Sequence, residues 1–113
     1  MKNYKTYQDK DLIEVFLDKL VTEKNLSHTT LSSYSSDLIL FNNFLNKKKN
    51  SITNCNEGAL KKWINFLVDN KIKSSSRIRK ISVIKQFFRF LCEEKFMEIN
   101  PAANLVLPKK KKK

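Results

Sequence analysis

Residues 73–91, with the sequence KSSSRIRKISVIKQFFRFL, carry the pattern that most constrains the fold of this chain. At the helical period, Ile81, Ile84, Phe88 and Leu91 fall on one side. This apolar arc is widened by Ile78, Val83, Phe87, Phe90 and Cys92. The opposite arc holds Arg79, Ser82, Lys85, Gln86 and Arg89. The pattern predicts a deeply buried helix with a separate basic face.

Residues that favour turns are scarce in the chain, which has one Gly and two Pro among 113 residues. A many-stranded sheet needs more turns than these residues supply, so helices joined by short connections are favoured. A single domain of this length buries roughly two-thirds of its unfolded surface, and eight Phe, three Tyr and one Trp provide a core. We therefore predict an all-α domain over residues 1–108, a bundle of four main helices plus a short C-terminal helix.

The first two helices are predicted from acidic, polar and apolar spacing. The first begins near Asp9 or Asp11, where acids suit the helix dipole, and ends at Asn25. Ser27 is placed to cap the second helix. The apolar positions of that second helix are Leu31, Tyr34, Leu38, Phe41 and Leu45.

The later helices have their own start signals. Asn54 and Glu57 have the spacing of a capping box for a third helix, whose inward residues are Leu60, Trp63, Ile64 and Leu67. Serines 74–76 are placed to cap the fourth helix, which should run to about Glu94. Asn100 followed by proline predicts one short final helix before an extended exit.

The net charge of the chain is +12, and it stays at +7 when the five lysines at 109–113 are left out. Such an excess indicates a polyanionic partner, with nucleic acid first and an anionic membrane surface second. A merely soluble, lysine-rich protein is the alternative. We expect residues 109–113 to be a basic tail or the start of a linker, disordered until it meets a polyanion.

Enzymatic and metal-binding patterns are missing from the sequence. It has no Gly-rich phosphate loop and no nucleophile with a flanking signature. Cys55 and Cys92 are too few and too far apart for a zinc cluster, and His28 is expected to be an exposed polar residue. We expect no catalytic residue, metal site, cofactor or small-molecule substrate. Without a membrane span or a secretory signal, the expected location is the cytoplasm.

Binding chemistry is better supplied on two of the predicted helices. One face of the second helix is small and polar, with Thr29, Ser32, Ser33, Ser36 and Asn43. Hydroxyls and backbone N–H groups near helix starts are common phosphate donors, and residues 27–30 and 74–76 supply them. Arg79, Lys85 and Arg89 can neutralise phosphates, and an arginine can also bind a guanine edge.

Short patterns spread along nearly the whole chain resemble one protein family. They are LIEVFL at 12–17, EKNLS at 23–27, Thr30-Leu31, Tyr34, Asp37-Leu38, Ser75-Ser76, Arg79, Ile81-Ser82, residues 87–91, EKF at 94–96, Asn100-Pro101-Ala102 and Pro108-Lys109. In order and spacing they resemble the N-terminal core-binding, or SAM-like, domain of tyrosine recombinases of the phage-integrase and Xer type. Where members of the Xer type often carry two arginines after the tyrosine of the second helix, this chain has Ser35 and Ser36.

The resemblance implies an all-α bundle that forms half of a C-shaped clamp around double-stranded DNA, with its second and fourth helices at the major groove. It implies DNA contacts at Thr30, Ser33, Ser36, Ser75, Arg79, Ser82 and Lys85. Together with the helix faces described above, the predicted DNA-binding residues are Thr29, Thr30, Ser32, Ser33, Ser36, Lys73, Ser74, Ser75, Ser76, Arg79, Ser82, Lys85, Gln86 and Arg89. Arg79 is expected to face the groove, and its replacement by alanine is expected to leave the fold intact.

The resemblance also implies a parent protein that cuts and rejoins DNA strands and assembles as a tetramer of protomers on DNA. Its catalytic half would follow Pro108, so we expect a fragment or a standalone binding domain without enzymatic activity of its own. The alternative is a helical protein-interaction module that does not bind DNA and docks a partner through Ile39 and Leu40. A role at a membrane surface ranks third, because no predicted helix pairs a lysine-rich face with exposed aromatic residues.

Overall fold

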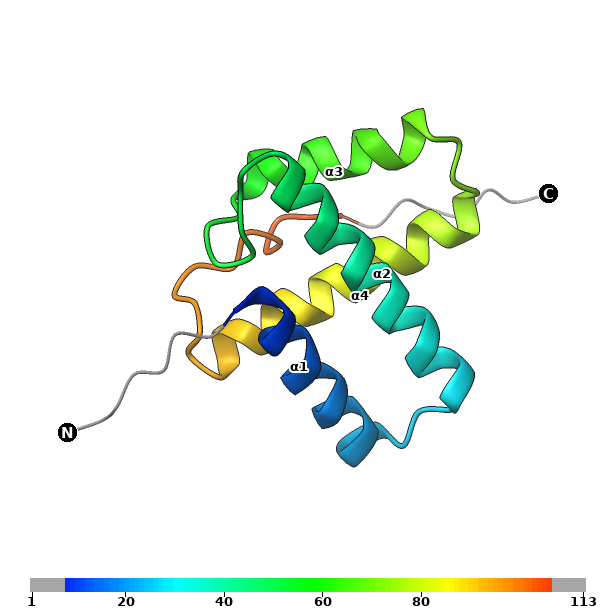
Figure 1. The fold of residues 1–113 in the computed structure, drawn as a ribbon, viewed down its shortest axis with the longest axis vertical. Coiled ribbons are helices and arrows are strands. Elements are labelled where there is room, and N and C mark those ends of the chain that lie inside the picture. The colour runs from blue at the N-terminus through cyan, green and yellow to red at the C-terminus, as the bar shows by residue number, and fades with distance from the viewer. Residues whose placement is uncertain (1–7, 107–113) are drawn as a thin grey trace.

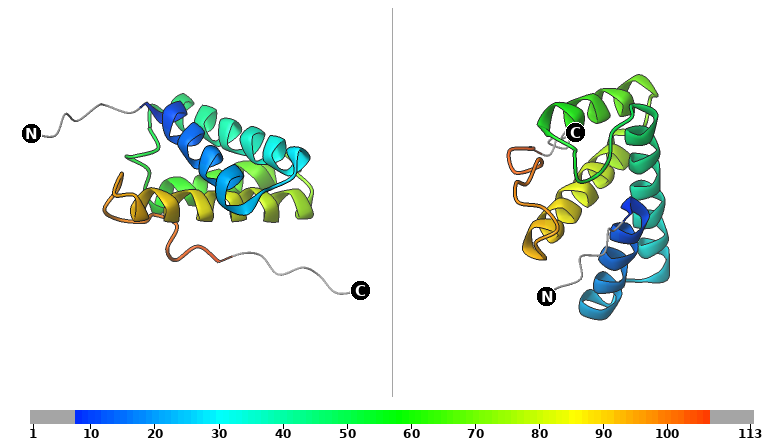
Figure 2. Two further views of the ribbon diagram at one scale, coloured as in Figure 1. Left: turned by 90° about the horizontal axis from the view of Figure 1, so that it is seen from below. Right: turned by 60° about the vertical axis from the view of Figure 1, so that its left-hand side comes forward.

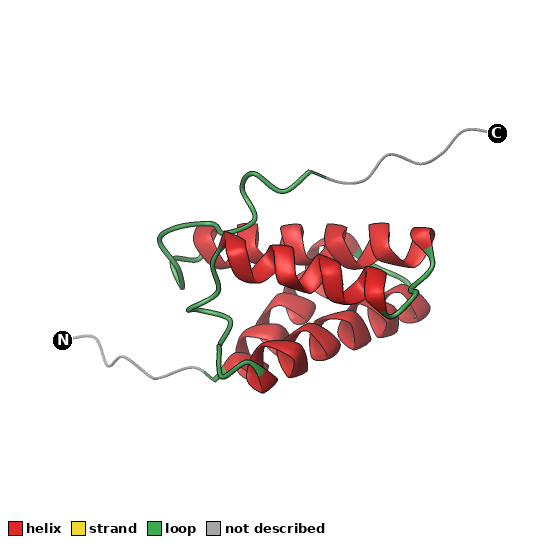
Figure 3. Cartoon of the chain, turned by 90° about the horizontal axis from the view of Figure 1, so that it is seen from above, coloured by secondary structure: helices red, strands yellow, loops and turns green. Residues whose placement is uncertain are grey.

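The computed structural model describes residues 8–106, which form four α-helices and no β-strand (Figures 1 and 3). The helices are α1 (Asp9–Lys24), α2 (His28–Lys47), α3 (Glu57–Asp69) and α4 (Ser74–Glu93). They form two layers, with α1 beside α2 in one and α3 beside α4 in the other (Figure 2). The predicted all-α class is confirmed. The predicted tail at 109–113 lies outside the described residues.

The ends of α1 and the start of α2 follow the sequence signals. Asn25 closes α1 in the left-handed conformation, with φ of 48°. The hydroxyl of Ser27 accepts a hydrogen bond from the Thr30 backbone N–H at 3.1 Å, so this serine caps α2 as predicted. Asp9, the first residue of α1, also contacts the α2–α3 connection, because its carboxylate accepts a hydrogen bond from the backbone N–H of Ile52 at 3.1 Å.

The starts of the two later helices differ from the prediction. Asn56, and not Asn54, caps α3, and its side chain accepts from the Ala59 backbone N–H at 2.9 Å. Asn54 lies in the connection before α3, where its backbone N–H donates to the carbonyl of Ser51 and closes a turn. The predicted serine cap of α4 is also wrong. Lys73 occupies the cap position without a side-chain bond, so serines 74–76 form the first helical turn.

The predicted short C-terminal helix is replaced by successive turns at residues 101–104. The Asn100 side chain accepts from the Ala102 backbone N–H at 2.8 Å, and the Asn100 carbonyl accepts from Ala103. The hydrogen bonds stop when Leu105 donates to Ala102, before a helical ladder can propagate. This segment lies along α4, to which it is tied by a hydrogen bond from the Lys85 ammonium to the Leu105 carbonyl (Figure 1).

A continuous series of aromatic contacts joins all four helices in the core. Phe16 of α1 meets Phe87 of α4 at a centroid distance of 5.3 Å, and the adjacent Phe88 meets Phe41 of α2 at 5.9 Å. Phe41 in turn packs edge-on against Trp63 of α3 at 5.3 Å. Phe88 is fully buried, as its place on the apolar arc predicts. Helix α4 contributes more buried side chains than any one of the other three helices.

Candidate nucleic-acid interface

The N-terminal ends of α2 and α4 lie on the same side of the molecule, and the two helices cross near its centre (Figure 1). None of the fourteen predicted DNA-binding residues is buried. The exposed ones are Thr29, Ser32, Ser36, Lys73, Ser74, Ser75 and Arg89. The partly buried ones are Thr30, Ser33, Ser76, Arg79, Ser82, Lys85 and Gln86. These side chains can therefore all be reached from solvent to some degree.

On α4 the predicted residues form a strip and not a single point. From residue 73 to residue 89 the helix rises about 24 Å at 1.5 Å per residue. The C-terminal half of this strip lines a hollow of about 290 Å³ on the side where the chain after α4 returns. The hollow is lined by Ser82, Lys85, Gln86, Arg89, Asn100, Ala102 and Ala103. Two cations and three polar side chains thus converge on a space large enough for a phosphate group.

Several of the strip residues already have partners within the chain. Lys85 donates to the carbonyl of Leu105, and Gln86 donates to the Ser82 hydroxyl at 3.5 Å. Arg89 lies 4.0 Å from Glu93 in an exposed pair, which holds the arginine only weakly. No local pattern in the sequence predicts that the segment after α4 returns to Lys85. That contact narrows access to one side of the strip.

Arg79 is engaged more firmly than the other strip residues. Its Nε donates to Oδ2 of Asp37 at 2.8 Å, and its Nη2 donates to Oδ1 at 3.0 Å. Lys80 donates to Oδ1 of the same carboxylate at 2.7 Å. The hydrogen bonds to Asp37 raise the pKa of Arg79, so the guanidinium stays charged. The expectation that Arg79→Ala leaves the fold untouched does not fit this geometry, because the substitution leaves the buried carboxylate with Lys80 alone.

Asp37 and Lys80 contact the predicted site at Arg79 but are not among the residues predicted from the sequence. Asp37 is the only acid in α2, and it lies three residues after Tyr34 and four before Phe41, on the apolar side. A lone acid at an apolar-face position signals a buried partner, since an unpaired buried carboxylate is costly. That signal was available in the sequence. The identity of the partners was not, because they lie more than forty residues away along the chain.

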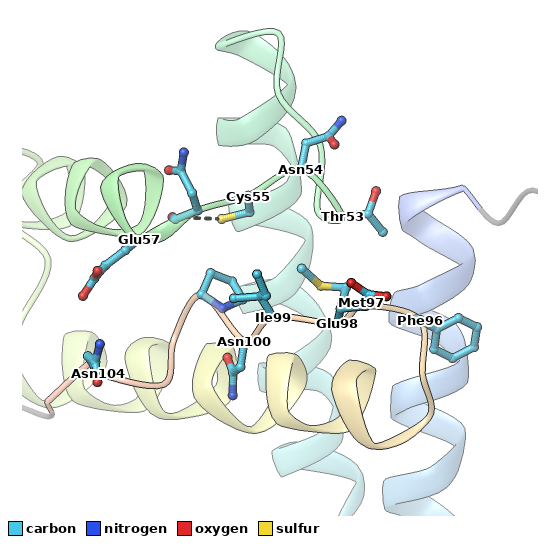
Figure 4. A pocket seen from close by; sticks show the side chains of 12 residues that line it. Thr53, Asn54, Cys55, Glu57, Phe96, Met97, Glu98, Ile99, Asn100 and Asn104 are labelled. Atoms are coloured by element: carbon cyan, nitrogen blue, oxygen red, sulfur yellow. Dashed lines mark hydrogen bonds between the residues drawn. The ribbon is translucent and has the colours of Figure 1, made fainter.

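A larger hollow lies elsewhere and has the opposite charge. It has a volume of about 650 Å³ and lies between the α2–α3 connection and the segment after α4 (Figure 4). Its only charged lining residues are Glu57 and Glu98. Burial raises the pKa of the Cys55 thiol in its wall to about 12, so that this cysteine stays protonated. A hollow with two acids and no cation disfavours nucleic acid.

The described residues carry few features of other kinds of site. None of the four helices between residues 8 and 106 combines the length and the apolar character that crossing a bilayer requires. Within the same residues, no three His, Cys, Asp or Glu side chains gather in a way that could hold a metal ion. His28 is exposed at the start of α2.

Comparison with known proteins agrees with the fold. Residues 13–95 match the phage integrase N-terminal SAM-like domain, and the chain belongs to this family. It is 37% identical over 99 residues to the tyrosine recombinase XerD of Rickettsia bellii, and 41% identical over 100 residues to XerD of Haemophilus ducreyi. It is also 37% identical over 99 residues to the tyrosine recombinase XerC of Staphylococcus epidermidis. Each match covers 88% of this chain, which spans about a third of each relative, 32% or 33%.

Proposed function

We propose that this domain binds double-stranded DNA as the core-binding half of a site-specific tyrosine recombinase. The observation that carries the proposal is the set of accessible side chains on two helices, namely the strip of cations and hydroxyls on α4 and the hydroxyls on α2. They belong to a domain whose relatives are named tyrosine recombinases. Helix starts rich in hydroxyls and backbone N–H groups suit phosphate oxygens, and the arginines suit phosphates or guanine edges. The strip is longer than a single phosphate contact, as binding along a duplex requires.

The whole recombinase would supply what this domain does not. We propose that strand cutting and rejoining belong to a catalytic part, and that protomers assemble as a tetramer on DNA. The domain alone then binds without cleaving. Such a protein acts where the chromosome is, in the cytoplasm and associated with the nucleoid.

Salt dependence provides the first test of the proposal. A labelled duplex is titrated with the 113-residue chain and with a version that ends at Pro108, at rising salt concentration. Each neutralised phosphate contributes about 0.9 to the slope of log affinity against log salt. We expect the shortened chain to bind more weakly but to keep most of its slope. Failure of the shortened chain to bind at low salt would remove the proposed function from the body of the domain.

A pair of matched double variants places the interface. Lys73→Ala with Arg89→Ala removes two exposed cations from α4 and its N-cap, and Lys61→Ala with Lys62→Ala removes two exposed cations from α3. Both lower the net charge by the same amount, so a general attraction to DNA weakens equally in both. We expect the α4 pair to lower the salt slope by about two and the α3 pair to leave it unchanged. Equal losses would contradict an interface on α4.

The competing function, a protein-interaction module, is supported by one residue. Ile39 on α2 is 50% exposed, whereas Leu40 is partly buried and packs against the core. A single exposed isoleucine is common on protein surfaces and provides little area for docking. Tight binding of a protein partner together with no DNA binding at low salt would favour this function.

A further inference from the structure

The carboxylate of Asp37 joins α2 to α4 at the edge of the candidate interface. Its side chain is 1% exposed, and it accepts three hydrogen bonds, two from Arg79 and one from Lys80. A buried carboxylate with two cationic partners is fully satisfied, so its position is well defined. We call these three side chains the Asp37 triad.

The charges of the Asp37 triad do not cancel. One carboxylate faces two cations, which leaves one positive charge in excess. The Lys80 side chain is 12% exposed, and that of Arg79 is 41% exposed. The excess charge therefore reaches solvent through Arg79, on the polar side of α4, while Lys80 mainly neutralises the buried acid.

The hydrogen bonds also fix the direction in which Arg79 points. A guanidinium is planar, and Asp37 occupies the edge formed by Nε and Nη2. Within residues 8–106, the remaining nitrogen, Nη1, has no hydrogen-bond partner. With two of its nitrogens anchored, the plane cannot turn freely, and less rotamer entropy is lost when a further group binds Nη1.

We propose that Asp37 is a positioning residue for DNA binding, which holds Arg79 so that Nη1 is presented to a phosphate oxygen of the duplex. This inference rests on the proposed function and deepens it. It assigns a role to an acidic residue at an interface for a polyanion, where a negative charge alone would be unfavourable. It also assigns Lys80 the role of neutralising Asp37, away from the DNA.

The sign of one substitution separates positioning from simple electrostatics. Asp37→Asn removes a negative charge, so the general attraction to DNA alone predicts tighter binding. If Asp37 positions Arg79, the same change weakens binding several-fold and lowers the salt slope by about one. Asp18→Asn is the matched control, because it changes the net charge equally at an exposed position of α1. We expect this control to bind DNA as tightly as the original chain or slightly tighter.

A double variant tests whether Asp37 acts through Arg79. In the background of Arg79→Ala, the further change Asp37→Asn should cause no additional weakening, because the residue that it positions is gone. A general disturbance of the fold would instead weaken binding in both backgrounds. Circular dichroism and the melting temperature of each variant show whether it is folded.

The variant Arg79→Lys keeps the test open if Asp37→Asn does not fold. A lysine keeps the charge and can still pair with Asp37. Its ammonium has no planar second edge, so while it is paired with Asp37 it cannot present a fixed donor to a phosphate, as Nη1 of Arg79 would. We expect its salt slope to fall by about one, as in Arg79→Ala. The inference is overturned if Arg79→Lys has the same salt slope as the original chain. It is also overturned if folded Asp37→Asn binds DNA as tightly as the original chain or more tightly. In both cases the proposed function stands. If the original chain does not bind duplex DNA, the proposed function fails and the inference fails with it.

Discussion

The contacts of α2 with its two neighbours in the other layer differ in chemistry. Against α3 it packs rings, with Phe41 and Phe44 each 5.3 Å from Trp63. Against the first half of α4 it is joined by the Asp37 triad. Apolar contacts stabilise without fixing direction, whereas hydrogen bonds to a carboxylate fix the direction of a side chain but return little net stability. The core therefore stabilises the domain, while the triad orients one side chain.

The largest effect is expected from breaking the aromatic series. Phe88→Ala removes a fully buried ring between Phe41 and Phe87 and should lower the free energy of unfolding by about 3–5 kcal/mol. Urea denaturation followed by circular dichroism measures the loss. A smaller loss than that of Asp37→Ala would mean that the triad, and not the aromatic core, contributes more to stability.

A smaller effect is expected from breaking the Asp37 triad. Asp37→Ala should lower the free energy of unfolding by about 1–3 kcal/mol, because Lys80 loses its partner while Arg79 can regain water. The same denaturation experiment, with Asp18→Ala as an exposed control, gives the value. An unchanged stability would mean that the triad contributes orientation only.

The buried thiol of Cys55 makes the stability of the domain sensitive to alkaline pH. Its pKa is raised by burial from 9.0 to about 12, so above pH 9 the unfolded chain releases this proton while the folded chain keeps it. Stability from this thiol is complete below pH 9 and is lost between pH 9 and about 12. At pH 10 the loss should be about 1 kcal/mol. It is measured as the pH dependence of unfolding above pH 9, which should shrink more in Cys55→Ala than in Cys92→Ala, because burial also raises the pKa of the less buried Cys92 thiol.

The smallest effect is expected at an exposed ion pair of similar length. Lys19 lies 3.1 Å from Glu94, but both side chains are substantially exposed, so water screens the pair. Glu94→Gln should leave the melting temperature unchanged within error. A drop as large as that of Asp37→Ala would show that burial is not what distinguishes the triad.

Much of the fold could be predicted from local spacing. The apolar arc of residues 78–92 and the cap at Ser27 both act within one or two helical turns, so the sequence displays them directly. The cap at Asn56 could not be chosen over Asn54 in this way, because the turn closed by Ser51 and Asn54 decides the matter. The prediction of a short final helix was wrong because the hydrogen-bonded turns after Asn100 end at Leu105 and do not continue into a helix.

The candidate site was predictable as a set of accessible side chains but not as a network. The helical period places Arg89 on the outside of the fourth helix, and Arg89 is exposed in the structure. The engagement of Arg79 depends on where α2 crosses α4, and that of Lys85 depends on the return of the chain after α4. Such contacts join residues twenty or more positions apart, and helical periodicity carries no information about them.

Trp63 gives the domain a built-in optical reporter. It is the only tryptophan of the chain, it is 1% exposed, and Phe41, Phe44 and Phe66 surround its ring. Its fluorescence therefore follows the packing between α2 and α3 and is shielded from direct quenching by a ligand on the polar faces of α2 and α4. Unchanged emission during a DNA titration would indicate that the packing of α2 against α3 stays the same when DNA binds. A shift of its maximum would instead disclose that the two layers slide when the duplex is bound.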